Sequence, residues 1–191
     1  MPPKQKYTQK SILDAAFEIL CINGIDAVGS RQIADKLNCS TQPIFSYFKD
    51  MEDLKYALIS KAKGLYSSYV HNGLKYETPF KGVGLEYINF AKNEPEVFKL
   101  LFMSAKKNTL DSLLDFDDNK KIIIKSLMEH SGLDVENAEK LCLNIWLYTH
   151  GIAVMSATDT ISFTEEEISN LLADAYIGFL MKIKNDIHNK I

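Results

Sequence analysis

The chain has 191 residues, of which 46% are hydrophobic and 25% are charged, and its formal net charge at pH 7 is −3. This length suits one large domain, or a small domain joined to a larger one, and the apolar content excludes a disordered chain. No apolar run approaches the ~20 residues that span a bilayer, and no signal-peptide pattern follows the basic start MPPKQKYTQK. We therefore expect a soluble, cytoplasmic protein with no membrane partner.

The charge is distributed unevenly along the chain. Residues 1–63 hold nine Lys or Arg and seven Asp or Glu, a net +2, whereas the remaining residues carry −5. Lys4, Lys6 and Lys10 form an N-terminal arm that contains no acidic residue. This distribution favours a nucleic-acid-binding segment near the start, although a solvated basic tail would give the same pattern.

The cysteines and histidines do not have the spacing of a disulfide framework or of metal ligands. We interpret each cysteine as a small apolar residue, with a redox-sensing thiol as the alternative, and we expect no metal and no other cofactor. These residues are Cys21, Cys39, Cys142, His71, His130, His150 and His188.

Hydrophobic residues recur at helical spacing from residue 8 onward, and no strand-like alternation interrupts them. The first predicted helix, 8–23, ends at Asn23-Gly24. Two short helices follow at 30–37 and 41–47, with Ser30 and Ser40 as their caps and Asn38-Cys39-Ser40 as the turn between them.

Further helices are predicted to the end of the chain. Asp50 caps a long one, and Thr164 with Glu167 forms a capping box for the last one. The remaining predicted ranges are 80–93, 95–105, 119–131, 134–157 and 164–188, with a possible short helix at 109–114. We expect an all-α protein with a three-helix domain at 1–53, which contains a helix-turn-helix, and a helical bundle at 54–191.

The second short helix has the composition of a recognition helix, which enters the major groove of DNA. Gln42 can pair with adenine, and Thr41 and Pro43 can contact a thymine methyl group. Ser46, Tyr47 and Lys49 can reach phosphates. Arg31 is the single arginine of the chain, and it reads as a DNA contact or as a surface ion-pair partner.

The stretch from Ile12 to Leu58 resembles the N-terminal domain of the TetR/AcrR repressors, which carries the blocks I-x-x-A-A-x-x-L-F-x-x-x-G, I-A-x-x-x-G-V-S and L-Y-x-[HY]-F-x-x-K-x-x-L. The resemblance implies DNA contacts at Arg31 and at residues 41–43 and 45–47, which adds Phe45 to the set. Asn38 stands in place of the turn glycine and tolerates a left-handed backbone. Phe45 and Met51 replace a tyrosine and a lysine that grip phosphate, a loss for which the lysine arm and Lys49 could compensate.

The blocks EYINFAKNEPEVFKLLF and IWLYTHGIAVM resemble the C-terminal domain of one branch of that family, marked by Trp146, His150 and Gly151. In that branch the domain dimerises through its last two helices and often holds a small molecule. Trp146 and His150 share a helix face, either as a packing pair or as part of an effector pocket. Candidate walls of such a pocket are Tyr66, Tyr87, Phe98 and Phe102.

Together these features predict a homodimeric repressor that is released from a palindromic DNA operator by a small hydrophobic or aromatic effector. The helices at 134–157 and 164–188 would form the dimer, with the apolar stripe Ile168, Leu172, Ala175, Phe179 and Ile183 facing the partner. A DNA-binding regulator or activator without an effector is the alternative. No Ser/His/Asp set, paired-carboxylate motif or phosphate loop supports an enzyme.

Overall fold

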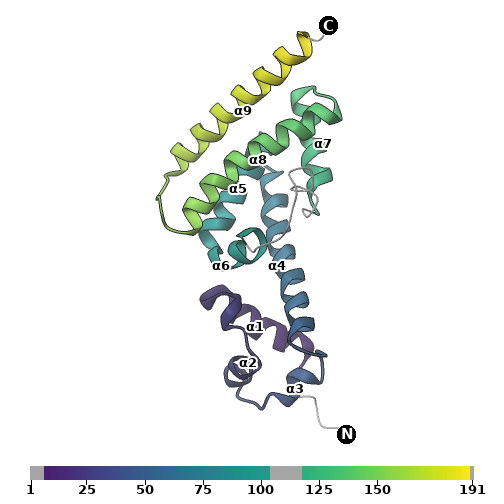
Figure 1. The fold of residues 1–191 in the computed structure, drawn as a ribbon, viewed down its shortest axis with the longest axis vertical. Helices are drawn as coiled ribbons and strands as arrows, with labels where there is room; N and C mark the ends of the chain where they lie inside the picture. Colours follow the sequence, from purple (N-terminus) through teal and green to yellow (C-terminus); the bar gives the residue numbers. More distant parts are fainter. Residues whose placement is uncertain (1–6, 104–117, 190–191) are drawn as a thin grey trace. The chain divides into compact units, whose positions relative to one another are not determined.

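The computed structural model describes residues 7–103 and 118–189, and every regular element in these ranges is a helix. The all-α prediction is therefore confirmed for the described residues (Figure 1). In chain order the elements are α1 (Gln9–Asn23), η1 (Ile25–Ala27), α2 (Ser30–Leu37), α3 (Gln42–Phe45), α4 (Met51–Gly73), α5 (Pro79–Asn93), α6 (Pro95–Phe98), the π-helical turn η2 (Lys99–Met103), α7 (Lys120–Ser131), α8 (Val135–Ala157) and α9 (Glu165–His188).

Most helix boundaries lie where the local chemistry predicts them. Gly24 follows α1 with φ 79°, a left-handed angle that costs glycine little. The Asp50 carboxylate accepts the Asp53 N–H at 2.9 Å at the start of α4. Thr164 and Glu167 form a reciprocal capping box on α9.

The two short helices differ in detail from the prediction. Gly29, and not Ser30, is the cap of α2, and no side chain caps α3. The recognition helix has only four residues, since Thr41 is its cap residue and the chain turns after Phe45. The predicted 95–105 helix is instead the short α6 followed by η2. The possible helix at 109–114 lies outside the described residues.

The described residues form two compact units, which we treat separately. The first unit holds residues 7–65 and 94–103, and the second holds residues 66–93 and 118–189. Both units contain part of α4, which passes from one to the other between Leu65 and Tyr66. The domain division after residue 53 stays a prediction made from the sequence.

The first unit is built around a buried cluster to which α1, α2, α3 and the start of α4 all contribute. Ile12, Leu20, Ile33 and Ile44 are fully buried in this cluster. The side chain of Phe48, which follows the recognition helix, is buried with them. Burying an aliphatic or aromatic side chain contributes about 1.5–3 kcal/mol, so these residues fix the faces that the two short helices turn inward.

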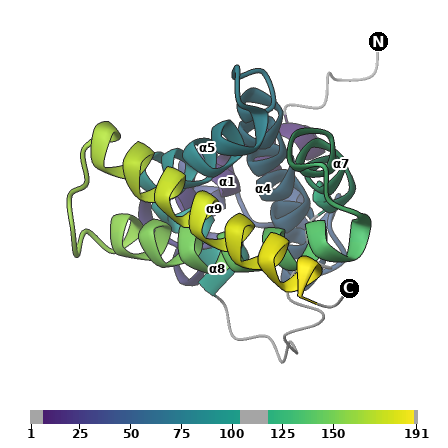
Figure 2. The same cartoon turned by 90° about the horizontal axis from the view of Figure 1, so that it is seen from above.

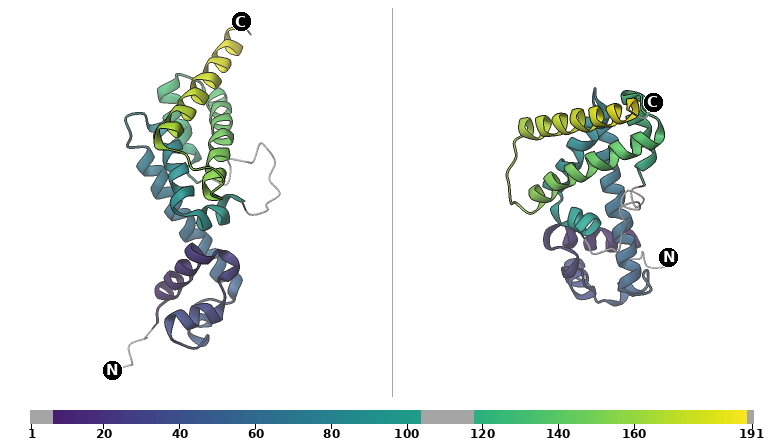
Figure 3. Two further views of the ribbon diagram at one scale, coloured as in Figure 1. Left: turned by 90° about the vertical axis from the view of Figure 1, so that its left-hand side faces the viewer. Right: turned by 45° about the horizontal axis from the view of Figure 1, so that its top comes forward.

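In the second unit α8 packs against α5, α7 and α9. The helices α8 and α9 form an antiparallel hairpin, and they run side by side in the views of Figures 1 and 2. Figure 3 shows α9 along α8 at the edge of this unit. Among the described residues no helix combines the length and apolar composition that a bilayer crossing requires.

Two glycines bring α4 and α5 into backbone contact within the second unit. A Cβ atom added to Gly82 would lie 2.2 Å from the Gly73 carbonyl oxygen, and one added to Gly73 would lie 2.6 Å from the Val83 backbone. Real Cβ atoms do not approach backbone so closely, and only glycine fits at either position. The end of α4 is thereby held directly against α5.

The apolar stripe predicted for a partner chain is partly used within the second unit. Ile168, Leu172 and Ile183 are buried in the isolated chain. The large apolar side chains that α9 exposes are Ile177 and Met181, which are 54% and 61% exposed. The helix prediction holds, and three of the five stripe residues pack within the unit, whereas Ala175 and Phe179 are only half-buried.

Candidate functional site

The turn between α2 and α3 depends on Asn38. Its backbone is left-handed, with φ 51° and ψ 52°, as the sequence predicts. The N–H of Cys39 donates to the Ala34 carbonyl at 2.9 Å and closes the turn. The two short helices thus have the order and connection of a helix-turn-helix.

Burial decides which face of α3 points outward. Ile44 is fully buried, whereas Gln42, Phe45 and Ser46 are exposed and Thr41 and Pro43 are half-buried. Phe45 is 46% exposed, which is unusual for a phenylalanine on a small helix. The structure therefore brings the predicted base-reading residues together on one accessible surface.

The hydroxyl of Tyr47 has a partner within the protein. It donates to the Tyr7 carbonyl at 2.9 Å, and the Tyr7 hydroxyl donates to the Asn38 carbonyl at 3.3 Å. These two bonds fix the start of the described chain against the helix-turn-helix. A phosphate contact by Tyr47 would have to replace the first of these bonds.

Some of the cationic side chains that the structure describes in the first unit are ion-paired, whereas others are exposed without an ion pair. Arg31 is exposed in the first turn of α2 and has no hydrogen-bond or ion-pair partner among the described residues. The side chain of Lys49 is exposed as well. Lys10 is paired with Asp14 at 2.7 Å, and the bonds from Lys10 and Lys61 lower the pKa of that carboxyl. Lys4 and Lys6 lie outside the described residues.

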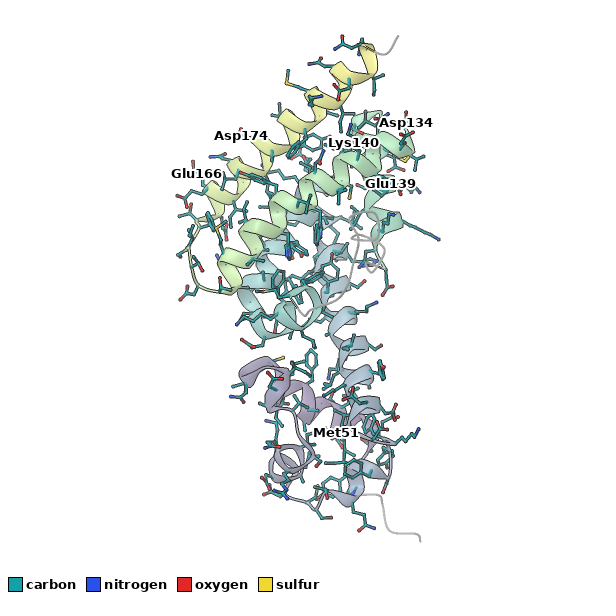
Figure 4. All side chains as sticks on the ribbon, viewed as in Figure 1. Met51, Asp134, Glu139, Lys140, Glu166 and Asp174 are labelled. Carbon is teal, nitrogen blue, oxygen red and sulfur yellow. The ribbon has the colours of Figure 1, made fainter. Side chains whose placement is uncertain are left out.

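Met51 and Ser46 both make contacts within the first unit. Met51, at the start of α4 in Figure 4, is half-buried and packs against the core of the first unit. The Ser46 hydroxyl donates to the Gln42 carbonyl at 3.1 Å within the recognition segment. Arg31 and Lys49 are thus the described cations that remain available to phosphates beside this face.

The second unit contains a cavity of about 50 Å³, which we call the small cavity. Three of the predicted pocket residues, Tyr66, Tyr87 and Trp146, line it. Further lining residues that the sequence did not single out are Phe80, Val83, Gly84, Lys120, Ile123, Cys142, Ile145 and Thr149. The α8 members recur at helical spacing with Trp146, and this spacing could have revealed them.

His150 lies behind this wall. Its ring stacks on Trp146 with centroids 4.7 Å apart and planes 10° apart. Its Nδ1 atom is 2.9 Å from the Tyr87 hydroxyl oxygen. Burial lowers the pKa of His150, so at neutral pH the imidazole is neutral and its Nδ1 can accept a hydrogen bond from the Tyr87 hydroxyl. The Trp-His pair is therefore a packing pair that also orients a wall of the cavity.

Phe98 and Phe102 are not part of this wall. Both belong to the first unit, where their rings pack against each other with centroids 5.2 Å apart. Because α6 packs on α1, Phe98 is buried in that unit. Aromatic residues at helical spacing gave no sign of which unit they would join.

A second cavity of about 200 Å³, the large cavity, lies in the same unit. It shares Phe80, Gly84 and Ile145 with the small cavity, so the two are neighbours. Its other lining residues are Thr78, Lys81, His130, Leu172, Ala173, Tyr176 and Ile177. A cavity of about 150 Å³ can hold a benzene ring, so this volume is sufficient for a small ligand.

Comparison with known proteins identifies the helix-turn-helix. The profile described as bacterial regulatory proteins, tetR family, matches residues 12–58. Residues 12–58 therefore carry a helix-turn-helix of the TetR type. The HTH-type transcriptional regulator YvkB of Bacillus subtilis is 43% identical over 54 residues, which are 28% of this chain. These residues span only 29% of that relative's length.

Solved structures resemble this chain over most of its length. A TetR-like regulator from Rhodococcus sp. RHA1 has a TM-score of 0.63 at 13% identity and covers 92% of this chain and 96% of its own. A TetR variant from Acinetobacter baumannii AYE, in complex with minocycline, has a TM-score of 0.54 at 14% identity, with 97% and 99% covered. The flavonoid-responsive regulator FrrA has a TM-score of 0.53 at 14% identity, with 91% and 94% covered.

At such identities these likenesses establish the fold alone. The family and the curated relative are regulators, which confirms the prediction that the chain is not an enzyme. Membership of the Trp-His-Gly branch stays a prediction.

Thr149 is an unusual residue in the wall of the small cavity. Its side-chain oxygen is buried and has no hydrogen-bond partner, and the residue is only 3% exposed. An unsatisfied buried hydroxyl costs about 1–3 kcal/mol. Thr149→Val, which keeps the shape, is therefore expected to raise the free energy of unfolding by about 1 kcal/mol in urea denaturation. A loss of stability would mean that the hydroxyl is satisfied in solution.

Proposed function

We propose that the chain is a ligand-responsive repressor that binds a palindromic DNA operator as a homodimer in the cytoplasm. A small apolar or aromatic effector in the second unit would release it. The observation that carries this proposal is the exposed face of α3, on which Gln42, Phe45 and Ser46 project while Ile44 anchors the helix in the core.

The exposed face of α3 suits direct readout of base edges. A Gln side chain can form two hydrogen bonds with adenine, and Thr and Pro offer apolar contacts to a thymine methyl group. Arg31 at the start of α2 and Lys49 after α3 flank this face with positive charge. We assign base reading to Arg31, Thr41, Gln42 and Pro43, and phosphate or groove contacts to Phe45, Ser46 and Lys49.

We assign the dimer to the outer faces of α8 and α9. Leu147 and Tyr148 on α8, and Ile177 and Met181 on α9, are large apolar residues that the isolated chain leaves exposed. Exposed charges border them, with Lys140 on α8 and Asp174 on α9 in Figure 4. An apolar patch with a polar border is typical of an interface. Two-fold pairing of such faces presents two recognition helices to half-sites about 34–36 Å apart.

The two cavities favour a regulator that binds an effector over the alternative, a regulator without an effector whose second unit would have a solid core. Structural relatives with the same fold bind minocycline or respond to flavonoids, according to their descriptions. An effector that prefers one conformation of the second unit would shift the dimer toward it. The helix α4 belongs to both units and is the element through which such a change would reach α3.

Selection of an operator from a random duplex library, followed by fluorescence anisotropy, tests this proposal. Gln42→Ala is expected to weaken operator binding by about 1–3 kcal/mol and to relax the preference at one base pair of each half-site. Its affinity for unrelated duplex and its salt dependence should stay unchanged, because Gln42 carries no charge. Equal losses on both duplexes would contradict a base-reading role.

A further inference from the structure

We propose that the effector is an elongated, largely apolar carboxylate. Its charged group occupies the small cavity, and its apolar body occupies the large cavity. This inference rests on the proposed effector site in the second unit and adds the chemistry of the ligand. Four observations support it. The cavities share a wall, and the charged side chains that line them are basic. The buried Thr149 hydroxyl has no hydrogen-bond partner, and the volumes of the two cavities differ.

The cavities are neighbours that share a wall at a position without a side chain. Both are lined by Phe80, Gly84 and Ile145. A Cβ atom added to Gly84 would lie 3.2 Å from Leu172 Cδ1, so the Leu172 side chain covers Gly84. A ligand that extends from one cavity into the other would displace this side chain, which a rotamer change allows.

The basic side chains on the two walls favour an anion. They are Lys120 in the small cavity and Lys81 with His130 in the large one. The other titratable lining residues are Tyr66, Tyr87, Cys142 and Tyr176. No Asp or Glu lines either cavity among the residues that the structure describes. Lys120 lies 3.3 Å from the carboxylate of Glu139, whose side chain is half exposed. A ligand carboxylate would join this lysine from the cavity side.

Thr149 supplies the second polar contact in the small cavity. Its buried hydroxyl can donate to a ligand oxygen, and a ligand that accepts this bond recovers the free energy that the empty site loses. Lys120 and Thr149 line the same small cavity, whose other walls are mainly apolar. A head group with oxygen acceptors and one negative charge matches these two donors.

The volumes assign the two ends of the ligand. About 50 Å³ in the small cavity accommodates a carboxylate-sized group, whereas about 200 Å³ in the large cavity accommodates a ring. Leu172, Ala173 and Tyr176 of α9 line the large cavity. The body of the ligand would thus contact α9, one of the two helices assigned to the dimer.

The test uses 4-phenylbutyrate and its neutral isostere 4-phenylbutyramide with the full chain. Trp146 is the single tryptophan and lines the small cavity, so its fluorescence reports occupancy there. We expect the carboxylate to bind at least tenfold more tightly than the amide. Lys120→Met should reduce this difference to less than twofold, and Lys121→Met, at an exposed position that lines neither cavity, should preserve it.

A blocking variant tests the path between the cavities. Gly84→Leu fills the shared wall and should abolish the fluorescence response to both probes, while circular dichroism verifies that the variant is folded. Thr149→Val should weaken both probes, since each presents an oxygen to the hydroxyl. An unchanged response in folded Gly84→Leu would overturn the two-cavity site.

The outcomes separate this inference from the proposed function. Equal binding of carboxylate and amide overturns the anionic effector but leaves an effector site in place. No binding of the carboxylate at millimolar concentration overturns the ligand class. Operator binding in the absence of probe tests the repressor itself, and the control variant Lys121→Met should leave that binding unchanged.

Discussion

Replacing Gly178 with leucine is expected to dissociate the proposed dimer and to weaken operator binding about a hundredfold or more. Gly178 lies on the exposed side of α9 between Ile177 and Met181. A Cβ atom added there would meet no atom within 4 Å in the isolated chain. A leucine side chain at position 178 therefore has room in the isolated chain. It would clash only with a second chain packed on this face.

The protomer itself should become more stable. Leucine is a better helix former than glycine, which costs about 0.8–1 kcal/mol within a helix. A dimer places this position in the interface twice, so the added side chains disturb the pairing from both sides. Stability of the protomer and stability of the dimer should consequently change in opposite directions.

Sedimentation equilibrium measures the dimer, and anisotropy with the selected operator measures DNA binding. Gly64→Leu is the matched control, because Gly64 is an exposed glycine of α4 and also has open space around an added Cβ atom. It gains the same helix propensity away from the assigned interface. A Gly178→Leu protein that still dimerises like the native protein would refute the assignment of this face.

Phe90→Ala is expected to lower the free energy of unfolding by about 3–5 kcal/mol. Phe90 is fully buried in the second unit, and its ring contacts Tyr66 and Tyr69 at centroid distances of 5.6 and 5.2 Å. Truncation leaves a cavity within this aromatic cluster and removes support from Tyr66, which lines the small cavity. Urea denaturation followed by circular dichroism measures the loss.

Phe45→Ala should affect operator binding and leave the free energy of unfolding almost unchanged. Phe45 is exposed on the recognition segment, and its removal should change stability by less than about 1 kcal/mol. Operator affinity should fall, because the apolar contact that Phe45 offers the groove is lost. Similar effects of the two variants on stability would contradict the burial that separates them.

The sequence predicted those elements that depend on local chemistry. Gly24, Asn38, Asp50 and Thr164 each act within a few residues of themselves, and the helix boundaries that they mark are found in the structure. The buried positions of the helix-turn-helix follow from helical periodicity for the same reason. The recognition face could therefore be predicted residue by residue.

The rest depends on contacts between segments far apart in the chain. Periodicity marked Phe98 and Phe102 as buried aromatics but could not show that α6 would join the first unit. The bond from Tyr47 to Tyr7 joins residues forty positions apart, and no local signal indicates it. Ile168, Leu172 and Ile183 read equally well as core or as interface, and only packing distinguished the two.

The contact between Gly73 and Gly82 has a mechanical consequence. Where two helices contact each other through side chains, rotamer changes can compensate for a small displacement. Gly73 and Gly82 contact each other through backbone atoms, which have no rotamers to change. The helix α5 carries Phe80, Gly84 and Tyr87 of the cavity walls, and α4 begins directly after the recognition segment. If a ligand displaced α5, the end of α4 at Gly73 would therefore be displaced by nearly the same distance.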